Sequence, residues 1–308
     1  MKNEFVKRGM IALVLLVFLA IVAVYFTDGK MFARHNGERL FANAYDKVLE
    51  VETIHVTTPK DQITLYLEED VWKVKEAGGY YANYYILLED LFPFMENTYY
   101  EYKSEEGILD EEDKVSLKIA TKDNRVIDEV TIAGTKVQAV GQDEVYVLDS
   151  ASKFVVPFDL YSWVVQPLMQ IDHKELEKFE TVSEKGHVVV SRIDVSAPFQ
   201  HEGKNVEMGK VLGAIAYLVF DAVVPEKDFN EDEFKEHKQF KFTTFDGLVV
   251  SLDIYHNGKE YWVRQELSTT KMPRSSVKSY VEYNKFLYEG WFFRLNADIA
   301  KNIFEYRV

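Results

Sequence analysis

The sequence predicts an α+β protein in which an apolar amino-terminal segment is followed by two related units. Three observations support this class. An uninterrupted apolar run lies near the amino terminus, stretches of period-two hydrophobicity alternate with stretches of helical spacing, and one spacing pattern occurs twice. The length of 308 residues suits two modest domains and an anchor, and the hydrophobic share of 47% is that of a folded globular chain.

The apolar run covers residues 9–26 and contains no charged residue and no proline. A helix of this length would extend ~27 Å, which is close to the ~30 Å thickness of a bilayer's hydrocarbon core. We therefore expect a transmembrane helix and the lipid bilayer as a partner. The positions that represent this anchor are Gly9, Met10, Leu13, Leu16, Phe18, Ile21, Val24 and Phe26.

The charges before the apolar run predict its orientation. Lys2, Lys7 and Arg8 precede the run, so we expect a cytoplasmic amino terminus and an extracytoplasmic body, held by a single span in the cytoplasmic membrane. A cleaved signal peptide and a buried soluble helix are the alternatives. The run is longer than the ~7–15 residues of a signal-peptide core, and Ala20 and Ala23 do not form a small-x-small site.

The first unit combines strands with two helical stretches. Period-two patterning predicts strands at 51–58, 62–70, 71–74 and 144–148, and a hairpin over 115–134 that turns at Asp123-Asn124. Helical spacing predicts a helix over 83–96, which Pro93 should kink or shorten, and a short helix over 160–171.

An internal repeat divides the rest of the chain. Apolar positions separated first by 11 and then by 21 residues occur twice, with an offset of 125 residues. We therefore expect a tail and anchor at 1–30 and two duplicated units with mostly antiparallel sheets, at 31–172 and 173–308. The anchors of the repeat are Ile54, Leu65, Ile86 and Trp163 in the first copy and Phe179, Val190, Val211 and Trp291 in the second.

The second unit is expected to repeat the first with one insertion. A helix follows Val206, and a hairpin over 240–258 turns at Asp246-Gly247, a dipeptide typical of tight hairpins. The strand at 260–264 matches the strand at 144–148, and a Lys-, Ser- and Thr-rich insertion follows near 268–283. Residues 175–192 offer no flexible linker, so we expect the two units to pack rigidly together.

A short tail, one span and two such units resemble the bacterial domain-of-unknown-function family 4340. The resemblance rests on ITLYLEEDVWKV with the helix YYANYYILLEDLFPFM, and on EVYVLDSASKFVVPFDLYSWVVQPLMQI. It implies a membrane-tethered accessory protein, of a kind often found beside components of gliding-type ABC transport systems, and no catalytic residue. The second unit departs from the pattern at Val195 to Phe199, where a proline replaces the tryptophan-containing strand.

Composition and motifs exclude several kinds of chemistry. The net charge of −15 argues against nucleic acid as a partner, and the absence of cysteine excludes disulfides, thiolate metal sites and cysteine nucleophiles. Histidine pairs with metal-binding spacing, serine-nucleophile elbows and phosphate-binding glycine loops are all absent from the sequence. We therefore expect no catalytic residue, no cofactor and no metal.

The aromatic share of 14% has two interpretations, a binding face or the packing of sheets and helices. The sequence thus favours a non-enzymatic scaffold or accessory subunit of a membrane complex, with an ABC-transporter permease as a candidate partner. The alternatives are a binding module for glycan, lipid or peptide with a groove between the units, and a hydrolase with dispersed carboxylates, because 51 acidic side chains always supply pairs.

Overall fold

The computed structural model describes residues 38–104, 109, 112–139, 143–149, 156–183 and 186–307. The expected anchor at 9–26 and the orienting residues Lys2, Lys7 and Arg8 lie outside this part of the chain. Within it, every helix is too short or too polar to cross a bilayer.

The first unit is built on a ten-stranded antiparallel sheet with the order β1-β6-β10-β9-β8-β7-β2-β3-β4-β5. Its strands are β1 (Glu38–Arg39), β2 (Thr53–Thr57), β3 (Gln62–Glu68), β4 (Val71–Val74), β5 (Tyr80–Tyr81), β6 (Tyr99–Lys103), β7 (Val115–Ala120), β8 (Val126–Ala133), β9 (Lys136–Ala139) and β10 (Tyr146–Leu148). Its helical elements are α2 (Ala42–Asp46), η1 (Val48–Glu50), η2 (Lys75–Ala77), η3 (Ile86–Leu91), α3 (Phe92–Asn97) and η4 (Leu160–Trp163).

The second unit is built on a nine-stranded sheet with the order β14-β13-β12-β11-β16-β17-β18-β19-β15. Its strands are β11 (Leu176–Ser183), β12 (Gly186–Ser191), β13 (Gln200–His201), β14 (Lys204–Asn205), β15 (Phe220–Pro225), β16 (Glu236–Thr244), β17 (Leu248–His256), β18 (Tyr261–Thr269) and β19 (Trp291–Leu295). Its helical elements are α4 (Gly209–Ala216), η5 (Glu226–Asp228), η6 (Glu231–Glu233), α5 (Ser275–Asn284), η7 (Lys285–Leu287) and α6 (Ala297–Phe304).

The two sheets share one topology. Read from β5 and from β14, they run through corresponding strands in the same order, and only β1 of the first sheet has no counterpart. The repeat anchors occupy matching registers, because Ile54 pairs with Leu65 across β2–β3 and Phe179 pairs with Val190 across β11–β12. All four side chains are fully buried. The chain is therefore an α+β protein with two tandem antiparallel units.

The two tryptophans of the predicted repeat do not occupy corresponding elements. Trp163 ends η4, after the last strand of the first sheet, whereas Trp291 opens β19, the counterpart of β10. The strand match was also wrong. The segment 260–264 belongs to β18, the counterpart of β9, whereas 144–148 contains β10. Similar short apolar patterns in neighbouring strands produced this misalignment.

The helix predicted over 160–171 is a single 3₁₀ turn, η4. Asp159 caps the turn through its hydrogen bond from the Ser162 amide, and Val164 then forms a β-bridge with Ala82. Pro167 cannot donate a backbone hydrogen bond and disfavours helical geometry in the residue before it. The apolar segment is therefore a buried extended connector rather than a helix.

The predicted helix over 83–96 forms, and it changes its winding just before Pro93. The wide turn η3 spans Ile86–Leu91, and α3 begins at Phe92 with Pro93 in its first turn. A proline in a regular helix clashes with the carbonyl group four residues earlier, and a wider turn relieves this clash. In the corresponding helix α4, which contains no proline, Val211 is fully buried.

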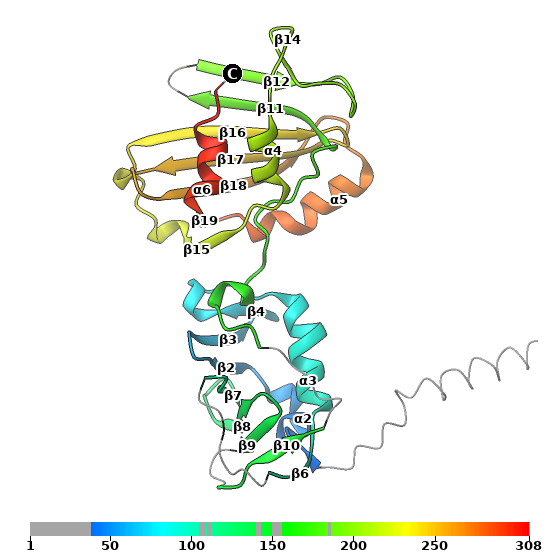
Figure 1. Cartoon of the computed structure of the whole chain (residues 1–308), viewed down its shortest axis with the longest axis vertical. Helices are drawn as coiled ribbons and strands as arrows, with labels where there is room; N and C mark the ends of the chain where they lie inside the picture. Colours follow the sequence, from blue (N-terminus) through cyan, green and yellow to red (C-terminus); the bar gives the residue numbers. More distant parts are fainter. Residues whose placement is uncertain are drawn as a thin grey trace, which may run out of the picture.

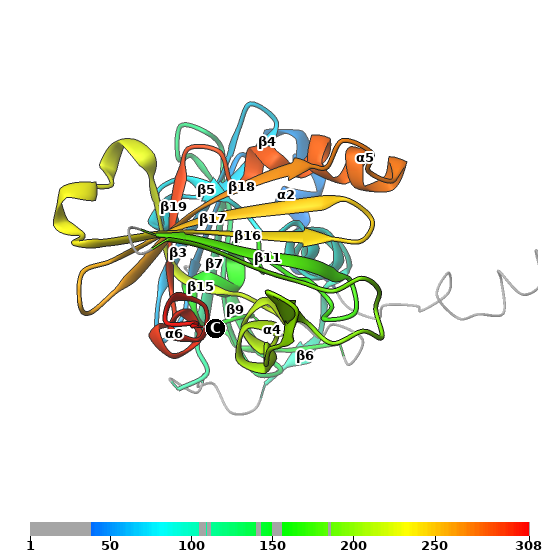
Figure 2. The ribbon, with the colours of Figure 1, turned by 90° about the horizontal axis from the view of Figure 1, so that it is seen from above.

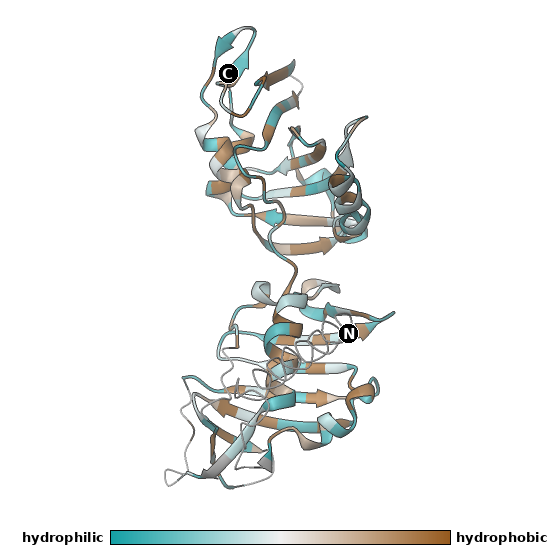
Figure 3. Ribbon diagram, turned by 90° about the vertical axis from the view of Figure 1, so that its right-hand side faces the viewer, coloured by the Kyte–Doolittle hydropathy of each residue, from teal (hydrophilic) through white to brown (hydrophobic). Residues whose placement is uncertain are grey.

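The core runs through both units. Sheet strands supply most of its buried side chains, and helices α4 and α6 cover one face of the second sheet (Figure 2). The hydrophobic segments follow the strands in both units, whereas the β13–β14 hairpin is hydrophilic (Figure 3). The first unit lies beneath the second along the long axis of the molecule, and one connector joins them (Figure 1).

Candidate functional site at the junction of the two units

The units meet at facing edges of the two sheets, where Tyr80 of the edge strand β5 contacts Phe220 of the edge strand β15. An edge strand presents unpaired backbone N–H and C=O groups, which must find partners if they are buried. The connector of residues 163–169 lies between these edges and pairs with both.

The connector forms backbone hydrogen bonds on each side. Towards the first unit, the Val165 amide donates to the Tyr81 carbonyl at 3.1 Å, and the Trp163 carbonyl accepts from the Asn83 amide at 2.8 Å. Towards the second unit, the Leu168 amide donates to the Leu218 carbonyl at 2.8 Å. The connector therefore forms isolated β-bridges beside β5 and just before β15, and these bridges link the two units.

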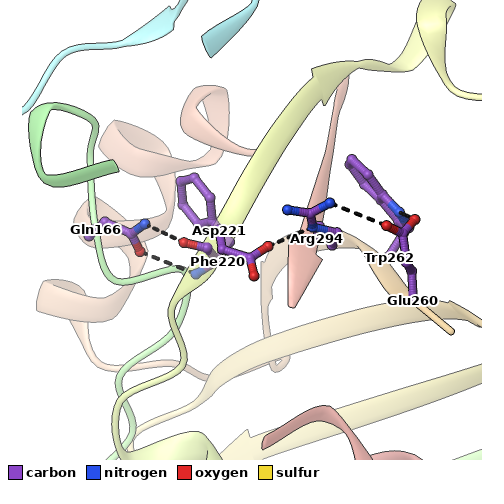
Figure 4. A network of polar contacts seen from close by, with 6 residues as sticks. All are labelled: Gln166, Phe220, Asp221, Glu260, Trp262 and Arg294. Carbon is purple, nitrogen blue, oxygen red and sulfur yellow. Dashed lines mark hydrogen bonds and ion pairs between the residues drawn. The ribbon is translucent and has the colours of Figure 1, made fainter. Parts of the chain in front are cut away.

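The side chain of Gln166 completes this link. Its Nε2 donates to the Phe220 carbonyl at 2.9 Å, and its Oε1 accepts from the Phe220 amide at 3.4 Å (Figure 4). The primary amide thus reproduces the donor and acceptor pattern of a neighbouring strand. Gln166 satisfies both backbone groups of the residue at which β15 begins.

A chain of charged groups continues from Phe220 across β15 and β19. Arg294 donates through Nε to Asp221 at 2.7 Å and through Nη1 to Glu260 at 3.2 Å (Figure 4). Glu260 also accepts from the indole of Trp262 at 3.1 Å. The hydrogen bond to Asp221 is the main cause that raises the pKa of Arg294. This network fixes the edge of the second sheet next to the connector.

Aromatic rings fill the rest of the junction. The Tyr80 ring lies edge-on to three rings of the second unit, at 5.1 Å from Trp291, 5.4 Å from Phe293 and 5.7 Å from Phe220. Such edge-to-face pairs contribute about 0.5–1.5 kcal/mol each beyond the burial of their area. Tyr80 is 1% exposed, and this burial raises the pKa of its phenol well above the ordinary value.

Gly78 lets the backbones of the two units approach closely. It ends η2 with a φ of +67°, and a Cβ at this position would lie 3.2 Å from Pro225 Cδ of the second unit. A side chain there would strain the backbone and press on Pro225 together. Glycine at this position is therefore part of the fit between the units.

A cavity lies within the second unit, away from the junction. Its volume is about 1020 Å³. The His256 imidazole stacks on the Tyr261 ring with centroids 4.2 Å apart, and its Nδ1 lies 3.8 Å from a Glu236 oxygen. Lys238 donates to the Phe304 carbonyl at 2.5 Å. The lining residues are Val182, Lys235, Glu236, His237, Lys238, Gln239, His256, Tyr261, Phe304, Glu305 and Arg307.

No cluster of three or more His, Asp or Glu side chains with metal-binding geometry occurs in the part of the chain that the structure describes. Hydrogen bonds lower the pKa values of three carboxylates, Glu68, Glu144 and Asp194. The main donors are Lys73 to Glu68, Lys103 to Glu144 and Ser196 to Asp194. None of the three is therefore suited to act as a general acid near neutral pH.

The repeat anchors contribute to the junction unequally. Trp291 packs on Tyr80 and Tyr81, and Trp163 supplies the carbonyl that accepts from Asn83. The anchors in β2, β3, β11 and β12 belong to the sheet cores instead.

Sequence reasoning did not identify Gln166 or Tyr80 as junction residues. The Tyr80-Tyr81 pair is visible as an aromatic cluster, but its location at an edge strand depends on the tertiary fold. Gln166 carries no sequence signal, because its role depends on Phe220, which lies 54 residues away.

Comparison with known proteins found no family model, no curated protein and no solved structure that matches this chain.

Proposed function

We propose that this protein is a single-pass membrane protein whose two-unit body acts outside the cytoplasm as a non-enzymatic scaffold or accessory subunit of a membrane complex. The apolar run at 9–26 supports the anchor. The two segments that resemble family 4340 point to a complex of the ABC-transport type, although no family model matches the chain. The observation that carries the scaffold role is the stitched junction, in which the connector and Gln166 hydrogen-bond both units.

A scaffold must hold its contact surfaces at fixed separations. Here the connector forms hydrogen bonds with both sheets, Tyr80 is enclosed by rings of the second unit, and one hydrophobic core includes residues of both units. A body fixed in this way holds its second unit at a constant distance and angle from its first. Tethering also raises the effective concentration of the body at partners in the same bilayer, so modest contacts are sufficient for assembly.

Protease protection in intact spheroplasts tests the topology. Externally added protease should digest the body while a cytosolic marker protein stays intact. Replacing Lys2, Lys7 and Arg8 with Glu should reduce the digested fraction, because the basic flank orients the span. A body that is protected from protease in intact spheroplasts and digested only after lysis would overturn the proposal.

Purification of the full-length protein in mild detergent, followed by mass spectrometry, tests the partnership. Recovery of a permease and its ATPase in constant ratio would support the accessory role. The matched control is the Tyr80→Ala variant, which should retain the anchor but lose the fixed arrangement of the units. Equal recovery with both proteins would argue against a role for the junction.

The cavity in the second unit favours a binding module as the second candidate function. Its volume of about 1020 Å³ is large enough for a small ligand, and aromatic and basic side chains line it. The partly exposed His256 imidazole, which is held by stacking on the buried Tyr261 ring, would supply a flat contact surface. A glycan and peptide array probed with the full-length protein and with a His256→Ala variant tests this function, because His256 lines the cavity and is partly exposed.

A further inference from the structure

An apolar groove on the first unit lies close to the end of the chain that is expected to enter the membrane. Its volume is about 1000 Å³, and it lies between α2–η1, the β3–β4 hairpin and α3. The groove residues are Ala44, Tyr45, Asp46, Val48, Leu49, Val51, Glu52, Leu67, Asp70, Trp72, Phe92, Met95 and Glu96.

The rim of this groove exposes apolar side chains to solvent. Leu49 is 97% exposed and Val48 is 65% exposed, and Tyr45 on α2 is about half exposed. The floor is well packed, since the Trp72 ring lies 5.8 Å from that of Phe92. Exposed apolar residues around a formed apolar floor are characteristic of an interaction site.

The charged residues of the groove all have the same sign. Its lining contains the acids Asp46, Glu52, Asp70 and Glu96 and no basic residue. Within the part of the chain that the structure describes, none of these four carboxylates forms an ion pair. The groove therefore combines an apolar floor with a negatively charged rim.

The apolar floor and the acidic rim together limit which kind of ligand can bind in the groove. Anionic lipid headgroups would be repelled by four carboxylates, and the same groove on a second copy would be repelled for the same reason. A peptide segment that is apolar at its centre and carries Lys or Arg at its ends would satisfy the floor and the rim together.

The position of the groove makes a membrane protein the source of this segment. Only residues 27–37 separate the expected span from β1, and a chain extends at most about 3.5 Å per residue, so β1 lies within roughly 40 Å of the bilayer. Helix α2 begins three residues after β1. The groove thus lies within reach of segments that emerge from the same bilayer.

We propose that this groove docks a basic, centrally apolar segment of a partner protein in the same membrane. The inference rests on the proposed function for the source of the segment, but the chemistry of the groove can be tested by itself.

Two peptides test that chemistry with the full-length protein in nanodiscs of zwitterionic lipid, with empty nanodiscs as the blank. Both peptides have a core of Leu, Ala and Phe, and they carry two Lys or two Glu residues at each end. The Lys peptide should bind roughly tenfold tighter than the Glu peptide, because several weak surface ion pairs act together, and added salt should reduce the difference. Equal binding of the two peptides would overturn the inference.

Variants locate the site. Asp46→Asn, Asp70→Asn and Glu96→Gln combined should remove most of the preference for Lys, and Leu49→Asp should weaken binding of the Lys peptide. Ile193→Asp is the matched control, because Ile193 is 90% exposed in the second unit and should leave binding unchanged. A variant series without effect on either peptide would place the binding elsewhere and overturn the inference.

A photocrosslinker at position 49 of the full chain in cells identifies the occupant. A crosslinked peptide with an apolar centre and basic ends, from a membrane protein, supports the inference, whereas a lipid adduct or a second copy of the chain overturns it. The peptide measurement does not depend on topology and the spheroplast measurement does not depend on the groove, so the two proposals can fail separately.

Discussion

At the scale of single residues, the junction depends on a side chain that forms the hydrogen bonds a neighbouring strand would otherwise form. Gln166 bonds both the amide and the carbonyl of Phe220, a task that a neighbouring strand usually performs. No property of an isolated Gln-Pro dipeptide predicts this role, because the partner becomes adjacent only after both sheets have formed.

Replacing Gln166 with Leu should lower the free energy of unfolding by about 1–3 kcal/mol, because both backbone groups of Phe220 lose a hydrogen-bonding partner. Urea denaturation of the full-length protein measures the change. The control is Gln170→Leu, which alters an exposed glutamine just beyond the connector. Equal midpoints for the two variants would contradict the role of Gln166.

Tyr255 makes stability depend on pH at the alkaline end. Burial, followed by the charge of Glu231, raises the pKa of Tyr255 to about 12. The unfolded state loses this proton near pH 10 and the folded state retains it, so the stabilisation is present below pH 10 and is lost as the pH rises from about 10 to about 12.

The Tyr255→Phe variant should therefore lose stability less steeply over this interval. One titrating group contributes a slope of up to about 1.4 kcal/mol per pH unit. Denaturation at a series of pH values measures the slope, and Tyr217→Phe, which removes a phenol from an exposed side chain, is the control. Parallel curves for wild type and Tyr255→Phe would be inconsistent with this account.

At the scale of elements, local pattern predicted strands well and helices less well. Alternating burial along β2 and β3 matches the alternating sequence, and the turn at Asp123-Asn124 forms with Asn124 at a φ of +60°. The segment 160–171 has apolar spacing that suits a helix. After the single turn η4, however, it is extended and forms β-bridges with Ala82 and Leu218. Tertiary pairing thus outweighed helical periodicity.

Comparing alanine substitutions at two glycines with similar φ angles distinguishes the cost of backbone strain from the cost of a clash between the units. Gly78 has a φ of +67° and Gly134 a φ of +59°. A Cβ atom at position 78 would lie 3.2 Å from Pro225 Cδ, whereas a Cβ atom at position 134 would have no neighbour within 4 Å. Gly134→Ala should cost about 1–2 kcal/mol of stability, and Gly78→Ala should cost roughly 1 kcal/mol more because Pro225 must shift. Urea midpoints compare the two, and equal costs would show that the contact with Pro225 is unimportant.

At the scale of the whole molecule, the repeated topology of the two units was visible in the spacing of a few buried residues. The offset of 125 residues located Ile54 and Phe179, and these do occupy equivalent registers. The offset failed for the tryptophans, because α5 lies between β18 and β19 and has no counterpart in the first unit. How the units dock could not be predicted, since the contact depends on which sheet edges face each other.

The two units should unfold in one transition, because their cores are continuous. Tyr80→Ala should lower stability by about 3–5 kcal/mol and separate the transition into two. Hydrogen exchange in each sheet of the full-length protein monitors the units individually. Phe41→Ala removes a fully buried ring that packs on Phe94 within the first unit, and it should destabilise the protein while retaining cooperativity. Two transitions in the wild-type protein would contradict the continuity of the core.

The connector has a mechanical consequence. The chain passes between the units once, and at that crossing it bonds laterally to residues of both, at Tyr81 and at Leu218. A pull that separates the two units would load several of these bonds simultaneously instead of opening them one after another. The connector should therefore transmit tension between the units and resist bending as a hinge.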